Sequence, residues 1–302
     1  MKKVFLIGLG LLIVLSYFSY GHVKELNNKP VIVVTFTILE DFTKQVAGDL
    51  ADVRCITAIG SEVHEWELTP RNFVDLEQAD IVFYNGYNTE QWMRQVRAVI
   101  RKDVQVIPVA ELSEYPPMPI ITGGLAGDPD PHIWMDPKGA QAYVEVIRDA
   151  LIELDPINAS DYIANAAKYL VELESLDLEI KEIISNLPVE KKVLITSEAA
   201  FFYFAKRYGF FHDAIWGTNS EEQGTPQQMM RIIRIIREKQ PAAIFWESTG
   251  SPRFAQTIAQ DTGIKIIGPL YVDSIGNISS GVESYVELQR ANVRLLLEVL
   301  GE

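Results

Sequence analysis

The sequence contains only one cysteine, Cys55, among its 302 residues. A single cysteine cannot form an internal disulfide, so the folded chain must be stable without a covalent cross-link. Cys55 lies in the apolar stretch VRCITAI, where we expect a buried strand residue rather than a reactive thiol. About half of the residues are apolar (48 %). Phe, Trp and Tyr, which supply large core side chains, make up 10 % of the sequence. This composition predicts a globular protein with a sizeable core.

Basic residues are also few, since 27 lysines and arginines face 41 aspartates and glutamates and the formal net charge is −14. Nucleic acids and anionic membranes bind proteins through clustered positive charge. The acidic balance therefore argues against both as partners. It suits a protein that carries cations, although acidic surfaces are common in other classes.

No apolar run is long enough for an ordinary membrane-spanning helix. Val4–Leu15 is the longest run near the start, and a spanning helix needs about 20 apolar residues. Two lysines precede this run, and Ser19 and Gly21 follow it in a small-x-small pattern. Residues 1–21 therefore resemble a cleavable secretory signal peptide, with an uncleaved anchor as the alternative. No cysteine directly follows the run, so we expect a periplasmic mature chain without a lipid anchor and without direct membrane insertion.

Short apolar runs alternate with amphipathic segments in both halves of the chain. This alternation predicts parallel sheets with helices on both faces, the α/β class. In the first half we predict strands at Pro30–Thr37, Val53–Ile59, Asp80–Asn85 and Val104–Val109. In the second half we predict strands at Lys192–Thr196, Ala242–Glu247 and Ile264–Pro269.

The middle of the chain lacks proline and glycine from Asn158 to Leu187. Its apolar residues recur with helical period, so we predict one long helix of about 45 Å at 1.5 Å per residue. The chain then divides into an N-terminal α/β lobe (22–157), a long connecting helix (158–187) and a C-terminal α/β lobe (188–302).

Histidine is scarce too, with four in the chain, and two of them lie in loops beside predicted strands or helices. These are His64 and His132; Glu198 and Asp273 follow predicted strands in the second lobe. Ligands bind at the carboxyl ends of strands in open α/β sheets, so these positions favour a site. Each has a structural alternative: His64 and His132 as packed histidines, Glu198 as a helix-capping carboxylate and Asp273 as a turn residue.

Several motifs resemble the metal-specific solute-binding proteins of ABC importers, which deliver zinc, manganese or iron. They are HEWELTP, DPHIWMDP, TSEAAFFYFAKRYGF, IFWESTGSP and GPLYVDSIG, together with the long middle helix. The resemblance covers nearly the whole mature chain. It implies a metal held between the lobes by His64, His132, Glu198 and Asp273, a membrane permease as partner, and no enzymatic activity. We expect a monomer.

The position of Glu198 implies which metal is carried. Zinc carriers of this family usually have histidine there and often a His-rich loop, whereas the segment before His132 contains no histidine back to Glu111. Two imidazoles and two carboxylates offer up to six donor atoms, which suits manganese or ferrous iron better than zinc. We therefore predict manganese, then iron, with zinc as the alternative.

Other classes stay open at this point. Two histidines and a carboxylate also form the facial triad of non-haem iron oxygenases, and an adhesin role is a third possibility. An enzyme needs an open coordination position and a substrate pocket, which a four-ligand site does not predict. His212, Glu247 and Asn219 lie near strand ends in the second lobe, and any could orient a ligand, but none is assigned a role.

Overall fold

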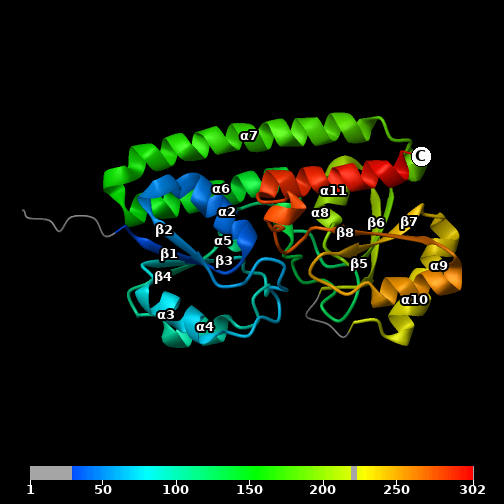
Figure 1. Cartoon of the computed structure of the whole chain (residues 1–302), viewed down its shortest axis with the longest axis horizontal. Coiled ribbons are helices and arrows are strands. Elements are labelled where there is room, and N and C mark those ends of the chain that lie inside the picture. The colour runs from blue at the N-terminus through cyan, green and yellow to red at the C-terminus, as the bar shows by residue number, and fades with distance from the viewer. Residues whose placement is uncertain (1–28, 219–222, 302) are drawn as a thin grey trace, which may run out of the picture.

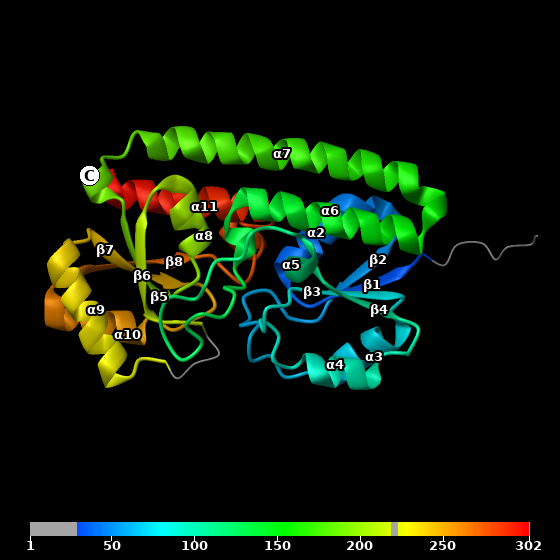
Figure 2. The same ribbon diagram turned by 180° about the vertical axis from the view of Figure 1, so that it is seen from behind.

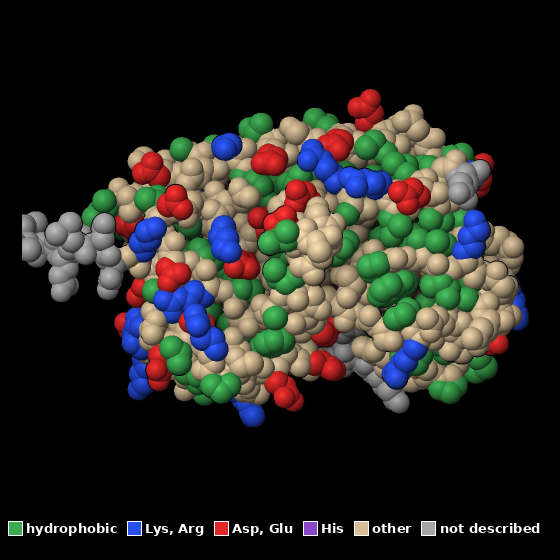
Figure 3. Space-filling model, viewed as in Figure 1, with side chains coloured by type: hydrophobic (Ala, Val, Ile, Leu, Met, Phe, Trp, Pro, Cys, Tyr) green, Lys and Arg blue, Asp and Glu red, His purple; other side chains and the backbone are tan. Residues whose placement is uncertain are grey.

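The computed structural model describes residues 29–218 and 223–301, which form two α/β lobes side by side beneath one long helix (Figure 1). The predicted signal peptide (1–21) and Asn219 lie outside the described residues. In the described ranges, no helix is both long and apolar enough to cross a membrane. The face seen in Figure 3 carries interspersed acidic and basic side chains.

The first lobe is built on a parallel sheet with the strand order β2-β1-β3-β4. The inner strands β1 and β3 are apolar on both faces, so helices cover both sides. The strands are β1 (Val31–Val34), β2 (Asp52–Cys55), β3 (Ile81–Tyr84) and β4 (Gln105–Pro108). The helices are α2 (Thr37–Ala47), α5 (Val109–Leu112) and α6 (Pro137–Leu154) on one face, and α3 (Pro70–Gln78) and α4 (Met93–Val99) on the other.

The second lobe repeats this plan with the strand order β6-β5-β7-β8, again all parallel. Its strands are β5 (Val193–Glu198), β6 (Phe211–Trp216), β7 (Ala243–Glu247) and β8 (Lys265–Leu270). Helices α8 (Phe202–Tyr208) and α11 (Tyr285–Leu300) lie on the side of the long helix. Helices α9 (Pro226–Lys239) and α10 (Arg253–Thr262) cover the outer side (Figure 2).

Helix α7 (Ala159–Ser185) spans both lobes, as Figures 1 and 2 show from opposite sides. Its buried face includes Leu173 and Leu176, which belong to a hydrophobic cluster that also contains Ile32 of the first sheet and Phe245 of the second. The two lobes therefore share one continuous core. At its far end, the Asp177 side chain accepts hydrogen bonds from the guanidinium of Arg207 on α8.

Two predicted strands run at least three residues past the observed ends. The stretch Pro30–Thr37 forms a strand only to Val34, and helix α2 already begins at Thr37. The stretch Val53–Ile59 leaves the sheet after Cys55, and Ile59 is 51 % exposed. Beyond these ends both segments reach the second lobe, where the Thr37 hydroxyl and the Gly60 N–H each bond to the Ser274 hydroxyl, and an apolar run does not encode such contacts.

Candidate metal centre

The structure brings His64, His132, Glu198 and Asp273 together where the two sheets face each other. His64 lies in the loop between β2 and α3, and His132 directly precedes the short 3-10 helix η2 (Ile133–Met135). Glu198 is the last residue of β5, and Asp273 follows the end of β8. All four residues are at most 2 % exposed. Both sheets thus direct their carboxyl-end loops to one buried point.

The distances between these side chains are those of a small cluster. Oε1 of Glu198 lies 3.6 Å from Nε2 of His64 and 3.6 Å from Nε2 of His132. Oδ1 of Asp273 lies 3.8 Å from the same nitrogen of His132. One donor atom each from His64, His132 and Asp273 lies within 4.8 Å of the others. A single ion placed among the His64, His132 and Asp273 atoms can contact all three, and Glu198 borders the two imidazoles.

Several of these buried atoms have no hydrogen-bond partner among the described residues. They are Nε2 of His64, Nε2 of His132 and both carboxylate oxygens of Asp273. Buried polar atoms are almost always hydrogen-bonded, because burial without a partner costs about 1–3 kcal/mol each. A divalent cation satisfies all of these acceptors at once. The residues present therefore fit a metal ion.

Each histidine is oriented through its other ring nitrogen. Nδ1 of His64 donates to the backbone carbonyl of Thr89 at 3.0 Å, and Nδ1 of His132 donates to Oδ1 of Asp130 at 2.7 Å. A carbonyl can only accept, so the proton of neutral His64 is on Nδ1 and the lone pair on Nε2 points into the cluster. This is the tautomer that metal coordination requires.

The two imidazoles differ in their protonation. Burial, and then the charge of His132, lower the pKa of His64 to about 3. Burial also acts to lower the pKa of His132, but the carboxylates of Asp130 and Asp273 together outweigh it, and the pKa of His132 is raised above its usual value. His64 is thus neutral at physiological pH, whereas a cation that binds His132 competes with a proton.

Glu198 is the terminal strand residue and not a helix cap. Helix α8 begins at Phe202 with Phe201 as its N-cap residue, three positions beyond Glu198. The backbone N–H groups of Ser197 and Glu198 both donate to Oε1 of Glu247, at 2.9 and 3.2 Å. The hydroxyl of Thr196 donates to the carbonyl of Glu198 at 2.5 Å. The end of β5 is therefore held from both sides.

His212 and Glu247, to which the sequence assigned no role, support this strand end. Nε2 of His212 lies 2.8 Å from the Thr196 hydroxyl, and the ring contacts Phe202 with centroids 4.5 Å apart. Burial lowers the pKa of His212 to about 3 and raises the pKa of Glu247 to about 8. Their partners lie 16 to 50 residues away in the sequence, which is why no local motif marked them.

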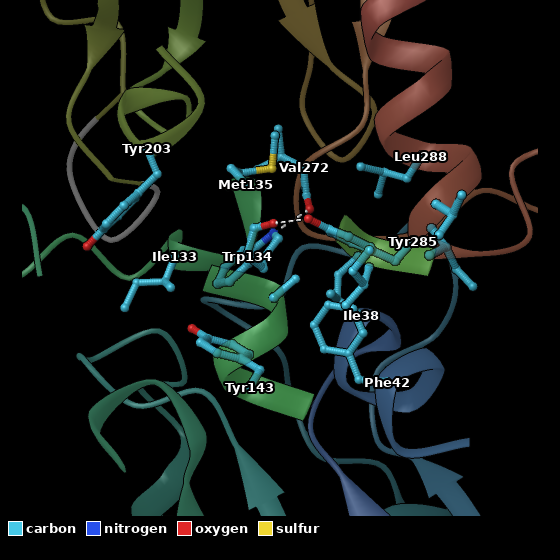
Figure 4. Close-up of a cluster of buried hydrophobic side chains, with 14 of the residues drawn as sticks. Ile38, Phe42, Ile133, Trp134, Met135, Tyr143, Tyr203, Val272, Tyr285 and Leu288 are labelled. Carbon is cyan, nitrogen blue, oxygen red and sulfur yellow. Dashed lines mark hydrogen bonds between the residues drawn. The ribbon is translucent and has the colours of Figure 1, made fainter. Parts of the chain in front are cut away.

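Aromatic side chains close the site on the side of α7. The ring of Trp134 lies 5.2 Å from that of His132, and its indole N–H donates to the carbonyl of Val272 at 3.0 Å. The hydroxyl of Tyr285 donates to the carbonyl of Trp134 at 2.7 Å, and Figure 4 shows both contacts. The segment that carries His132 is thus joined directly to the one that carries Asp273.

A small cavity reaches the cluster beside His64. It measures about 210 Å³ and touches His64, with Tyr87, Asn88, Asp128 and Thr218 among its walls. Pockets for organic ligands usually measure about 300–1,000 Å³. The cavity therefore fits an ion with its water molecules better than a metal chelate or an organic substrate.

Comparison with known proteins agrees with this geometry. Residues 32–299 match the family described as "Zinc-uptake complex component A periplasmic". The chain is 38 % identical to the "Iron-binding protein YfeA" of Yersinia pestis, over 90 % of this chain and 86 % of that protein. It is 33 % identical to the "Manganese ABC transporter substrate-binding lipoprotein PsaA" of Streptococcus pneumoniae, over 92 % and 91 % of the two chains.

A solved structure shows the same architecture. The Mn-bound periplasmic metal binding protein from Candidatus Liberibacter asiaticus superimposes with a TM-score of 0.82 at 30 % sequence identity. The match covers 90 % of this chain and 100 % of that one. The two-lobed arrangement is therefore shared over almost the full length.

Proposed function

Because the chain belongs to the family of periplasmic component A of the zinc-uptake complex, we propose that it is the metal-binding component of an ABC importer and captures its ion with His64, His132, Glu198 and Asp273. The observation that carries this proposal is the set of buried ligand atoms of His64, His132 and Asp273 that have no hydrogen-bond partner among the described residues. Such atoms are costly without an ion and are satisfied by one.

The cargo we propose is manganese, with ferrous iron second. Two neutral imidazoles and two carboxylates form an electrically neutral site around a divalent ion. The carboxylates can each bind through one or both oxygens, so the coordination number can exceed the four that zinc prefers. One relative is named for iron and another for manganese, which supports this choice. Zinc, for which the family is named, is the alternative cargo.

The partners follow from this role. We propose that the mature chain is periplasmic and releases its ion to a permease in the inner membrane. The signal-peptide pattern in residues 1–21 and the periplasmic description of the family support this location. Members of the family are solute-binding transport proteins. Four protein ligands around one ion hold that ion and leave little room for a substrate to bind it, so they favour metal transport over catalysis. We therefore propose a carrier and not an enzyme.

The test is metal binding by the purified chain. Isothermal titration with Mn²⁺, anaerobic Fe²⁺ and Zn²⁺ should give one ion per chain. Asp273→Asn and His132→Ala should weaken binding of each metal by at least about tenfold. Glu174→Gln, a change at a carboxylate on α7 outside the site, is the control and should bind as the unmodified chain does. One-to-one binding that survives both site changes would refute the assignment.

A further inference from the structure

Both candidate histidine ligands are preceded, two residues earlier, by an acidic residue. Glu62 precedes His64 and Asp130 precedes His132. In each pair the carboxylate accepts a hydrogen bond from the backbone N–H of the histidine, at 3.1 and 3.0 Å respectively. The two loops therefore begin with the same local arrangement.

The pairs differ in where the carboxylate meets the ring. Asp130 contacts Nδ1 of His132, on the side away from the cluster. In His64 this nitrogen is already bonded to the Thr89 carbonyl, and Oε1 of Glu62 instead lies 3.9 Å from Nε2. Glu62 is thus on the side of the imidazole that faces Glu198 and the rest of the candidate ligand cluster.

Two hydrogen-bond acceptors, Nε2 of His64 and Oε1 of Glu62, therefore lie close to each other. Nδ1 of His64 bonds to the Thr89 carbonyl, which leaves Nε2 to present its lone pair, and the Glu62 carboxylate offers only acceptor oxygens. The 3.9 Å contact between Nε2 and Oε1 of Glu62 is too long for a hydrogen bond. It becomes favourable when a cation, or a water molecule bound to a cation, lies between the two atoms.

Glu62 also differs from the four buried residues in its access to solvent. Its side chain is 26 % exposed, compared with 1 % for His64 and 2 % for Glu198. The loop that carries it is anchored beside Asp273, because the N–H of Gly60 donates to the hydroxyl of Ser274 at 2.7 Å. Glu62 is thus partly exposed to solvent and also lies close to one of the buried candidate ligands.

We propose that Glu62 is an outer carboxylate that contacts the hydrated divalent ion on its way into and out of the buried site. This inference rests on the proposed metal-carrying function. A negative charge at the solvent side attracts the ion and replaces part of its hydration shell before the four inner residues bind. The carboxylate should therefore accelerate association and dissociation alike while contributing little to the final affinity.

Stopped-flow mixing with Mn²⁺ measures this directly, with the fluorescence of Trp134 beside His132 as the signal and excess EDTA for dissociation. Glu62→Gln keeps an oxygen acceptor for the His64 N–H but removes the charge. We expect both rate constants to fall about tenfold, with Kd changed less than about threefold. Glu65→Gln, which removes an exposed charge from the same loop, should alter each rate less than about twofold.

Two results would overturn the inference. Unchanged rates in Glu62→Gln would mean that Glu62 only holds the backbone of His64. Faster dissociation with a matching loss of affinity would make Glu62 a permanent ligand. Equilibrium titration of the unmodified chain tests the underlying function separately. If that chain binds Mn²⁺ and only the rate prediction fails, the outer-carboxylate role alone is wrong, whereas failure of the unmodified chain to bind any of the three metals refutes both.

Discussion

The hydroxyl of Tyr203, on helix α8 of the second lobe, donates a 2.9 Å hydrogen bond to the backbone carbonyl of Asp130 in the loop that carries His132. The same hydroxyl accepts a 2.9 Å hydrogen bond from the N–H of Met118, earlier in that loop. One buried phenol therefore ties the loop before the second histidine to the other lobe. Both hydrogen bonds go to the backbone of this loop, so we expect Tyr203 to affect metal binding through the loop.

Tyr203→Phe removes both hydrogen bonds with little change in side-chain volume. We expect the metal-free protein to lose about 1–2 kcal/mol of unfolding free energy. Affinity for Mn²⁺ should fall about tenfold, because the orientation of His132 depends on this loop. Denaturant titration and calorimetry measure the two effects.

Tyr208→Phe is the matched control on the same helix. The Tyr208 hydroxyl donates to Oδ1 of Asp177 on α7, away from the cluster. This variant should lose similar stability but retain Mn²⁺ affinity. Equal losses of affinity in both variants would show that Tyr203 acts only through general stability.

Glu198 should determine metal selectivity. Glu198→His removes a carboxylate with two possible donor oxygens and leaves a net positive charge when a divalent ion is bound. Manganese favours oxygen donors and high coordination more than zinc does, so the zinc-to-manganese affinity ratio should rise at least about tenfold. Glu198→Ala should weaken manganese binding without this compensation. Titration calorimetry of both variants with both metals is the measurement, and an unchanged manganese affinity in Glu198→His would contradict the ligand role.

Glu90 should make the stability of the metal-free protein depend on pH. It is buried and accepts hydrogen bonds from the Thr35 hydroxyl at 2.6 Å and the Asn85 N–H at 2.7 Å, and burial raises its pKa from 4.5 to about 7. Between these values the folded state holds the proton more tightly than the unfolded state. The stability that protonated Glu90 contributes to the folded state is therefore complete below pH 4.5 and is lost as the pH rises through 7.

The comparison is between the unmodified chain and Glu90→Gln, each denatured in EDTA at pH 5 and pH 8. The stability of the unmodified chain relative to the variant should fall by roughly 2–3 kcal/mol from the lower to the higher pH. Glu77→Gln, at an exposed position on α3, sets the background level. The prediction is wrong if the difference in unfolding free energy between the two chains is the same at both pH values. It is also wrong if the unmodified chain is relatively more stable at pH 8 than at pH 5.

The lobes should move only modestly when the ion leaves. Helix α7 packs along both lobes, and hydrogen bonds cross between them close to the cluster, such as the one from the Ile275 N–H to the Thr37 hydroxyl at 3.0 Å. A stiff helix and a shared core oppose the hinge closure seen in carriers whose lobes are joined by flexible segments. Small-angle scattering with and without Mn²⁺ should show a change in radius of gyration below about 1 Å. A larger change would indicate a true hinge.

The sequence by itself determined most of the architecture, although the predicted strands of the second lobe did not include β6. Alternating apolar runs and amphipathic segments predicted two parallel α/β lobes, and the proline- and glycine-free stretch 158–187 predicted the helix observed at 159–185. These features are local, because side-chain periodicity and helix breakers act within a few residues. Asp136 shows the same locality, since its carboxylate caps α6 by accepting from the N–H of Lys138.

Only the tertiary structure decided how the candidate site is supported. Glu247 accepts hydrogen bonds from the end of β5, and Tyr203 donates one to the loop of His132. Glu62 lies beside Nε2 of His64. The contacts of Glu247 and Tyr203 join residues at least 49 positions apart in the chain. The position of Glu62 depends on the bond between Nδ1 of His64 and the Thr89 carbonyl, which leaves Nε2 on the side of Glu62. No local pattern encodes such contacts, because they exist only after two separate sheets have brought their carboxyl ends to one point.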